Sequence, residues 1–540
     1  MSKKLLMTLA LTLCAGAKAQ TIDLRTAAVK PLRHTWSTGV CAGRVNEGLR
    51  ASWQEQLQTV QDHCHFKYLR MHALFDDDMC VYFEHGDRPV YSWQYVDDVY
   101  DRMLAKGIRP FVELSFFPKG IAADTSKLQM WYRNRVTPDR SRYPKWHDLV
   151  KAFCEHVVER YGIDEVARWY FEVWNEPNLD FGFFDGTRSD YFALYETTAR
   201  AVKAVSPRLR VGGPATSNFI ADGRHDGERC DNAKSVFYPQ DQINRQQWKG
   251  VWIEDFLRFC ADRSLPVDFI SCHAYPTDYA LDPVTKHGKD AIRYVHSLRD
   301  DIGWLRKTVA ESRYPEAEIH ITEWSTSPSS RDPMHDLLPP AAYIVKANIE
   351  NDGRVNSVMY WTFTDIFEEK GGGEEIFHGG FGMINYQGIV KPAFHAYRML
   401  CRLGDECIYQ QDPLIVSRHS ESGKITAIAY NYPSEYEQQV PSARHQNDYM
   451  DASDKTVNCL LRGLRPHARF ELETLDKDHG NAYDEWVRMG KPHSPTRDQT
   501  RRLKEAGWNT LKQTVQADAR GQLTLHLTLK PWTVVLMSES

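Results

Sequence analysis

Two glutamates, Glu176 and Glu323, each follow a run of strand-forming residues and precede residues that turn the chain. The run at 169–174 is aromatic and β-branched, and Pro177 cannot continue a strand ladder. The run at 318–322 is similar, and a loop follows it at 325–330. Catalytic groups of parallel α/β barrels lie at the carboxyl ends of the strands, so the two glutamates are expected to face each other across a barrel mouth. The chemistry that needs such a carboxyl pair is glycoside hydrolysis.

The elements that would carry these residues alternate between strand-like and helix-like segments. We expect strands at 35–40, 67–73, 109–116, 168–174, 208–213, 267–274, 318–322 and 357–362. Amphipathic segments lie between them at 52–64, 95–106, 146–161, 189–205 and 341–352. This alternation predicts the α/β class and a (β/α)8 TIM barrel over residues 34–404. On this count Glu176 follows the fourth strand and Glu323 the seventh.

The pattern changes after about residue 404. Short strand-like runs at 425–430, 457–461, 469–474, 523–529 and 531–537 predict an accessory β-sandwich domain over 405–540. Residues 20–33 could add an edge strand to this domain. A helix-like stretch at 496–513 interrupts the domain, and the sequence does not explain it. The long polar segment 218–250 follows the fifth strand, so we expect it to cap the barrel mouth and shape a pocket.

The composition, 42% hydrophobic and 26% charged, is that of a globular protein. Residues 1–19 have the pattern of a signal peptide, with Lys3-Lys4, an apolar run at 5–16 and Ala17-Lys18-Ala19 as a cleavage site. The apolar run is too short to span a bilayer, and Cys14 does not follow a small residue, so we expect no membrane anchor. The prediction is a periplasmic or secreted protein. No basic stripe indicates nucleic-acid binding.

Ten cysteines follow residue 19 without a CxxC pair or a His/Cys cluster, so we expect no metal and no cofactor. An oxidising compartment would permit the disulfides Cys230–Cys260 or Cys401–Cys407, although most of the ten are expected to be buried thiols. The oligomeric state cannot be inferred from the sequence.

An ordered series of motifs runs through residues 35–400. It includes 43–44, 68–72, 110–116, 172–178, 211–214, 268–275, 321–324, 361–365 and 377–382. This series resembles glycoside hydrolase family 39, which contains β-xylosidases and α-L-iduronidases, and most closely its bacterial xylosidase-like branch. In the C-terminal part the likeness is weaker and rests on 474–476, 479–480 and Trp486.

The resemblance implies a retaining mechanism with Glu176 as acid/base and Glu323 as nucleophile, their carboxyl groups ~5–5.5 Å apart. Glu176 must be protonated when substrate arrives, so its pKa should be raised by the ionised Glu323 nearby. Either glutamate alone could be a salt-bridged residue at a strand end, but the pair in this setting favours catalysis.

The resemblance also implies substrate-binding residues. Asn175 should bind the sugar 2-hydroxyl, and Tyr275 should hold the nucleophile while His273 binds substrate. The remaining candidates are His72, Phe116 and Trp361 around the sugar, and one of Glu368 and Glu369 on its hydroxyls. Each has an ordinary alternative: a turn-stabilising asparagine, a core histidine, core aromatic packing or a solvated acid.

We therefore expect a secreted retaining exo-glycosidase, and foremost a β-D-xylosidase acting on plant-type oligosaccharides. One alternative keeps the mechanism but changes the sugar to an arabinoside or a uronide, and a basic residue in the pocket would favour the uronide. The other is a non-catalytic sugar-binding protein on the same fold, against which the two intact glutamates argue.

Overall fold

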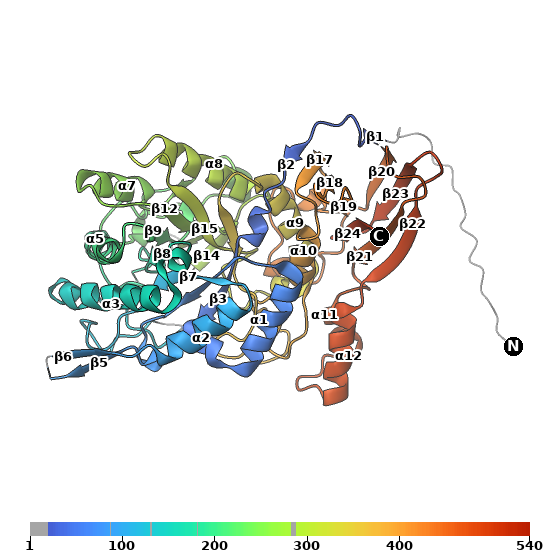
Figure 1. The fold of residues 1–540 in the computed structure, drawn as a ribbon. Coiled ribbons are helices and arrows are strands. Elements are labelled where there is room, and N and C mark those ends of the chain that lie inside the picture. Colours follow the sequence, from blue (N-terminus) through green and yellow to red (C-terminus); the bar gives the residue numbers. More distant parts are fainter. Residues whose placement is uncertain (1–19, 87, 130–131, 181, 282–287) are drawn as a thin grey trace.

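The computed structural model describes residues 20–86, 88–129, 132–180, 182–281 and 288–540, so the expected signal peptide lies outside the described residues. Eight parallel strands close into a barrel (Figure 1). In chain order they are β3 (Gly39–Arg44), β4 (Tyr68–His72), β7 (Arg109–Leu114), β8 (Tyr170–Val173), β9 (Arg210–Thr216), β12 (Phe269–His273), β15 (Glu318–Trp324) and β16 (Ser357–Tyr360). The predicted TIM barrel is confirmed.

Helices surround the strands. They are α1 (Ala51–Cys64), α2 (Gln94–Ala105), α3 (Tyr143–Tyr161), α5 (Arg188–Val205), α7 (Ile253–Asp262), α8 (Ser297–Ala310), α9 (Pro339–Asn351) and α10 (Pro392–Leu400). Helix α5 illustrates why they form: Thr187 and Asp190 make a capping box at its start, and Tyr191, Leu194 and Thr198 recur on its buried face.

The first barrel strand does not lie at 35–40, where the sequence pattern predicts it. Residues Thr35–Ser37 form a 3-10 turn, and the strand runs from Gly39 to Arg44. Thr35 N donates to Asp352 Oδ1 at 2.9 Å, and Gly353 N donates to Thr35 Oγ1 at 2.9 Å. These bonds tie the turn to the loop before β16, so the strand-like character of this segment comes from its burial and not from a sheet.

Two sheets of mostly antiparallel strands pack beside the barrel. The larger has the order β2 (Lys30–Pro31), β17 (Glu406–Gln411), β18 (Leu414–Arg418), β19 (Ile425–Tyr430), β24 (Val534–Glu539), β21 (Arg469–Leu475) and β22 (Leu511–Gln516). The smaller has the order β1 (Gln20–Asp23), β20 (Lys455–Arg462) and β23 (Gln522–Leu529). Val416 and Phe470 of the larger sheet share one apolar cluster with Leu461 and Leu525 of the smaller. This arrangement is the predicted β-sandwich.

The helix predicted at 496–513 is shorter in the structure. Helix α12 (Arg497–Trp508) ends first, and β22 begins at Leu511. β22 is an edge strand whose side chains are largely exposed, so it lacks the apolar alternation that marks a strand in sequence.

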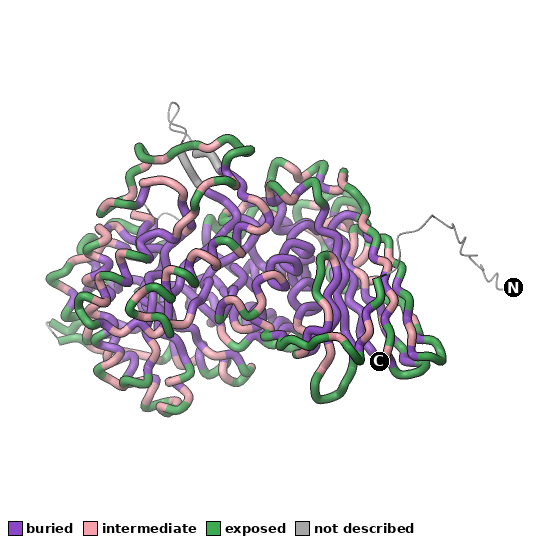
Figure 2. Tube along the Cα trace, turned by 90° about the horizontal axis from the view of Figure 1, so that it is seen from above, coloured by how far each residue is buried: buried purple, intermediate pink, exposed green. Residues whose placement is uncertain are grey.

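Helices α11 (Ala482–Arg488) and α12 lie against the barrel. Trp486 and Leu503 form an apolar cluster with Ile376 and Phe377 of the loop after β16. The main core is also shared, because Tyr432 and Trp532 of the C-terminal part belong to the same cluster as the barrel helices. Figure 2 shows buried residues running without a break from the barrel into the sandwich.

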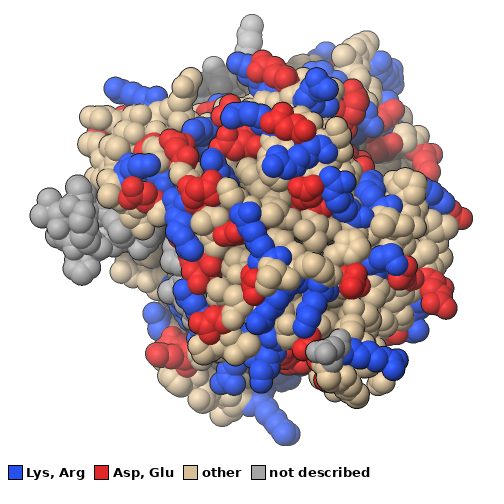
Figure 3. Space-filling view, turned by 90° about the vertical axis from the view of Figure 1, so that its left-hand side faces the viewer, with Lys and Arg blue, Asp and Glu red and all other residues tan. Residues whose placement is uncertain are grey.

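The ten cysteines within the described residues are all free thiols, so neither expected disulfide is formed. Within the same residues, no helix is long and apolar enough to cross a membrane. The face of the barrel in Figure 3 carries basic and acidic side chains interspersed.

Candidate active site

Glu176 and Glu323 open into one cavity of about 340 Å³, where each is less than one-tenth exposed. Glu323 is the penultimate residue of β15, and Glu176 lies in the turn after β8. That turn places two non-glycine residues in the left-handed region, Trp174 at φ 72° and Glu176 at φ 43°. Such strain is typical of functional sites. Glu176 N donates to Ala215 O at 2.9 Å, which fixes the turn to β9.

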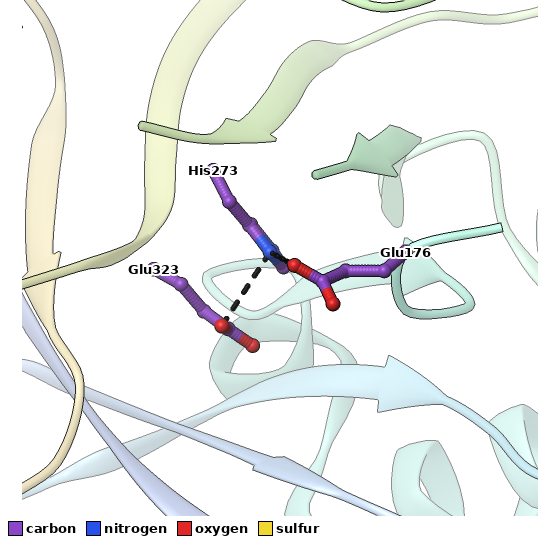
Figure 4. Close-up of side chains that lie close together, drawn as sticks. All are labelled: Glu176, His273 and Glu323. Carbon is purple, nitrogen blue, oxygen red and sulfur yellow. Dashed lines mark hydrogen bonds and ion pairs between the residues drawn. The ribbon is translucent and has the colours of Figure 1, made fainter. Parts of the chain in front are cut away.

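His273, at the end of β12, lies between the two carboxyl groups (Figure 4). Its Nδ1 is 2.8 Å from Glu176 Oε1 and 3.5 Å from Glu323 Oε2. The facing oxygens of the two glutamates lie within 4.8 Å of each other. Inverting glycosidases separate their carboxyl groups by ~6.5–9.5 Å to hold a water, so this spacing matches the retaining arrangement.

A buried cation, Arg70 of β4, lies beneath the pair. Its Nη1 is 2.9 Å from Glu323 Oε1, its Nε is 2.5 Å from Glu172 Oε2, and its Nη2 is 2.8 Å from Glu113 Oε2. Nη2 also donates to Asn175 Oδ1 at 2.9 Å. One guanidinium is therefore shared by three carboxyl groups, and its planar donors fix their relative positions.

Arg70, Glu113 and Glu172 are not among the site residues expected from the sequence, although all three lie inside the motifs given above. They could have been found because they are charged residues inside otherwise apolar barrel strands. Charged side chains are rarely buried unless they are paired, so their presence there indicates an ion pair or a functional site. Arg70 and His72 are also two apart, hence on the same side of their strand.

Both oxygens of Glu323 have hydrogen-bond donors. Arg70 binds Oε1, and Tyr275 OH donates to Oε2 at 3.0 Å. His72 Nε2 lies 3.6 Å from Oε1, while its Nδ1 lies 2.6 Å from Glu113 Oε2. Arg70, Tyr275 and His72 thus all lie within 3.6 Å of the carboxyl oxygens of Glu323, the nucleophile candidate.

Burial raises the pKa of Glu176 from 4.5 to about 7, against the opposing effects of Ser217 and Arg70. The pKa of Glu176 is shifted in the expected direction, but the main cause is burial and not the neighbouring Glu323. Burial also raises the pKa of Glu323, with Glu176 adding to the rise and His273 and Arg70 opposing it. The contacts of Glu323 with the Arg70 guanidinium and the Tyr275 hydroxyl stabilise a negative charge on this carboxyl group.

The two histidines are neutral at ordinary pH. Burial lowers the pKa of His273 to about 4 and that of His72 to about 3. They act as hydrogen-bonding groups and not as cations.

Aromatic rings line the part of the cavity around Glu323. Trp361, Phe381 and Phe183 belong to this wall, and the Trp361 ring lies 4.7 Å from that of His72. Phe116 is fully buried, with its ring 5.1 Å from Trp174 and 6.2 Å from Phe183, so it supports the wall from behind.

A buried ion network holds the loop that carries Phe381. Lys391 Nζ lies 2.6 Å from Asp336 Oδ1 and 2.6 Å from Asp365 Oδ2. Asp365 Oδ1 in turn accepts from Gly382 N at 2.6 Å. A Cβ at Gly382 would lie 2.3 Å from Asp365 N, so the close approach of the two loops requires glycine there.

Glu368 and Glu369 have different environments, which the sequence could not distinguish. Glu368 pairs with Arg44 at 2.8 Å and Arg50 at 2.5 Å, outside the cavity lining. Glu369 lines the cavity, and burial raises its pKa to about 7. Glu369 is therefore the member of the two that can meet a substrate hydroxyl.

The segment 218–250 contributes to the cavity wall as expected. Its lining residues are Asn218, Ile220, Arg224, His225, Cys230 and Asn232. None was selected from sequence, because polar residues in a long loop are usually solvated.

Glu176, His273 and Glu323 are also the one group of three possible metal ligands found among the described residues. A divalent ion there would occupy both carboxyl groups of the pair. It would also compete with Arg70 for Glu323, so the set fits acid/base and nucleophilic chemistry better than metal binding.

Comparisons with known proteins agree with this geometry. The model of Glycosyl hydrolases family 39 matches residues 21–524. The chain is 35% identical over 486 residues to a beta-xylosidase of Geobacillus stearothermophilus, covering 88% of this chain and 86% of the relative. It is 33% identical over 507 residues to a beta-xylosidase of Caldicellulosiruptor saccharolyticus, covering 93% and 94%. The crystal structure of a monomeric beta-xylosidase from Caulobacter crescentus CB15 matches with a TM-score of 0.81 and 29% identity, covering 97% and 99%. The chain belongs to glycosyl hydrolase family 39 and is a glycoside hydrolase.

Proposed function

We propose that this protein is a retaining exo-acting β-D-xylosidase, with Glu323 as nucleophile and Glu176 as acid/base. The observation that carries the proposal is the carboxyl pair, which His273 holds within 4.8 Å at a cavity over the barrel mouth. The choice of xylose rests on the beta-xylosidases that align with nearly the whole chain.

The contacts suggest how the reaction would proceed. Glu323 attacks the anomeric carbon while protonated Glu176 gives its proton to the departing oxygen, which leaves a covalent glycosyl-enzyme. Glu176 then removes a proton from water, which attacks the same carbon and breaks its bond to Glu323, so that the Glu323 carboxylate is released. Arg70 and Tyr275 orient Glu323 for the attack. Asn175 Nδ2 is buried and has no partner among the described residues, so it is available to bind the sugar 2-hydroxyl.

The size of the cavity supports exo action. Ligand pockets hold ~300–1,000 Å³, and this one is near the lower limit at about 340 Å³. Such a volume suits the end of a short oligosaccharide better than the middle of a polymer.

The uronide alternative needs a cation for the substrate carboxylate. Arg224 lines the cavity, but it is paired with Asp222 at 2.7 Å and with Asp278 at 3.0 Å. Its charge is therefore compensated. Lys370 is the other Lys or Arg among the described lining residues, and it lies at an exposed position. The balance favours a neutral sugar. A sugar-binding protein without activity would not need a carboxyl with a pKa of about 7 beside a second buried carboxyl that is bonded to a cation.

Export also belongs to the proposal. The expected cleavage site precedes Gln20, where β1 begins. Fractionation of cells would test it.

A panel of 4-nitrophenyl glycosides tests the sugar, and proton NMR of the fresh product tests the mechanism. We expect the β-D-xyloside to be hydrolysed fastest and the first product to be β-xylose, because the short carboxyl separation leaves no space for a water opposite the leaving group. First release of α-xylose would exclude the proposed roles. Faster hydrolysis of an arabinoside or uronide would change the proposed sugar specificity but would not contradict the proposed mechanism.

Activity is expected to fall as the pH rises through about 7. Glu176 acts as an acid only while protonated, and burial raises its pKa from 4.5 to about 7, so the proton is kept below that pH and lost above it. The measurement is kcat/KM against pH on an aryl xyloside. In Glu176→Gln, assayed with an activated leaving group, this alkaline limb should disappear; its persistence would assign it to another residue.

A further inference from the structure

The walls of the catalytic cavity differ in chemistry. The wall around Glu323 is built of aromatic rings, Trp361 and Phe381 among them. The second wall, on the side of Glu176, comes from the segments 178–179 and 217–232. It carries the amides of Asn178, Asn218 and Asn232, together with Ser217, Arg224, His225, Cys230 and the apolar Leu179 and Ile220.

The position of the acid/base decides which part of a substrate meets the second wall. A general acid must lie within hydrogen-bond reach of the oxygen that departs, so the leaving group is on the side of Glu176. Glu176 N is bonded to Ala215 O at 2.9 Å, which brings the segment after β9 directly beside the acid.

Asn178 locks this segment in place. Its Oδ1 accepts from Ser217 N at 2.8 Å, and its Nδ2 donates to Ser217 O at 3.2 Å. The turn that carries Glu176 and the residue before Asn218 are thereby joined as one rigid unit, so Asn218 has a defined position relative to the acid.

Asn218 has the features of a binding group. It lines the cavity, and its backbone is in the left-handed region at φ 62°, which asparagine tolerates better than most residues. Its Oδ1 is buried and has no hydrogen-bond partner among the described residues. Buried polar atoms are normally paired, so this oxygen is suited to accept a bond from a hydroxyl that enters the cavity.

We propose that residues 217–232 form the leaving-group subsite and that Asn218 makes it specific for a sugar by accepting a hydrogen bond from a hydroxyl of that sugar. The inference rests on the proposed β-xylosidase activity. An aryl leaving group has no hydroxyl to donate, so it does not use Asn218.

The test compares xylobiose with 4-nitrophenyl β-D-xyloside in the variant Asn218→Gly. Glycine accepts the left-handed backbone, so this change removes the amide without straining the loop. We expect kcat/KM on xylobiose to fall roughly tenfold, the effect of one lost hydrogen bond, and kcat/KM on the aryl xyloside to change less than about twofold.

Two further variants complete the design. Asn218→Asp keeps an acceptor oxygen at the same place and should retain more xylobiose activity than Asn218→Gly. Gln247→Ala removes an exposed amide that lies in the longer segment 218–250, beyond residue 232, and does not line the cavity, so kcat/KM should change on neither substrate.

Equal losses on both substrates, or no loss on xylobiose, would overturn the role of Asn218. Activity of Asn218→Asp no better than that of Asn218→Gly would also overturn it. Failure of the proposed function looks different, because the unmodified protein would then hydrolyse neither xyloside.

Discussion

Replacement of Glu323 by alanine is expected to lower kcat on 4-nitrophenyl β-D-xyloside by roughly 10,000-fold or more, because the attacking carboxylate is lost. The fold should survive, since Arg70 keeps its ion pairs with Glu113 and Glu172. Steady-state kinetics and circular dichroism would measure the two effects.

Azide makes this experiment specific for a nucleophile. A small anion can enter the vacated space and attack from the side of Glu323, so the product from a β-xyloside should be the α-configured xylosyl azide. Glu368→Ala is a matched control, because that glutamate pairs with Arg44 and Arg50 and does not line the cavity. An unchanged rate in Glu323→Ala would remove Glu323 from the mechanism.

Glu176→Ala is expected to slow hydrolysis of xylosides with poor leaving groups by ~100- to 10,000-fold, and to affect activated phenols far less in their first step. An acid matters only where the departing oxygen needs a proton. Measurement of kcat/KM across a series of aryl xylosides of rising phenol pKa should therefore give a much steeper dependence in the variant.

The second step of Glu176→Ala should also respond to azide. The glycosyl-enzyme accumulates for lack of a base, and azide, which needs no base, should restore turnover with formation of the β-xylosyl azide. The same loss for every leaving group would contradict an acid/base role for Glu176.

The barrel strands could be predicted closely because each is an apolar run bounded by turns. The exceptions have physical causes. Thr35 and Trp36 look like strand residues but are buried in a turn that Asp352 holds, and β22 is an exposed edge strand without apolar alternation. The conformation of each segment depends on contacts with residues distant in the chain, which a local sequence pattern does not reveal.

The carboxyl pair could likewise be found from its motifs, whereas its supporting residues could not. Arg70 matters because strands distant in the chain bring Glu113, Glu172 and Glu323 around it. The orientations of Glu368 and Glu369 depend on two arginines and on burial. The proposed role of Asn218 rests on an oxygen without a partner among residues 20–86, 88–129, 132–180, 182–281 and 288–540, which is a property of the folded chain.

The continuous core of the barrel and the C-terminal part has a consequence for how the protein could be divided. Tyr343 of α9 lies 6.2 Å from Tyr432, and Tyr432 lies 5.2 Å from Trp532, so aromatic packing crosses residue 404 without an intervening linker. A fragment that stops there would lack Tyr432 and Trp532 and would expose the ring of Tyr343 to water, at a cost of about 1.5–3 kcal/mol for one large apolar side chain. Division of the chain at residue 404 is therefore expected to destabilise the barrel, because part of its core comes from the C-terminal residues.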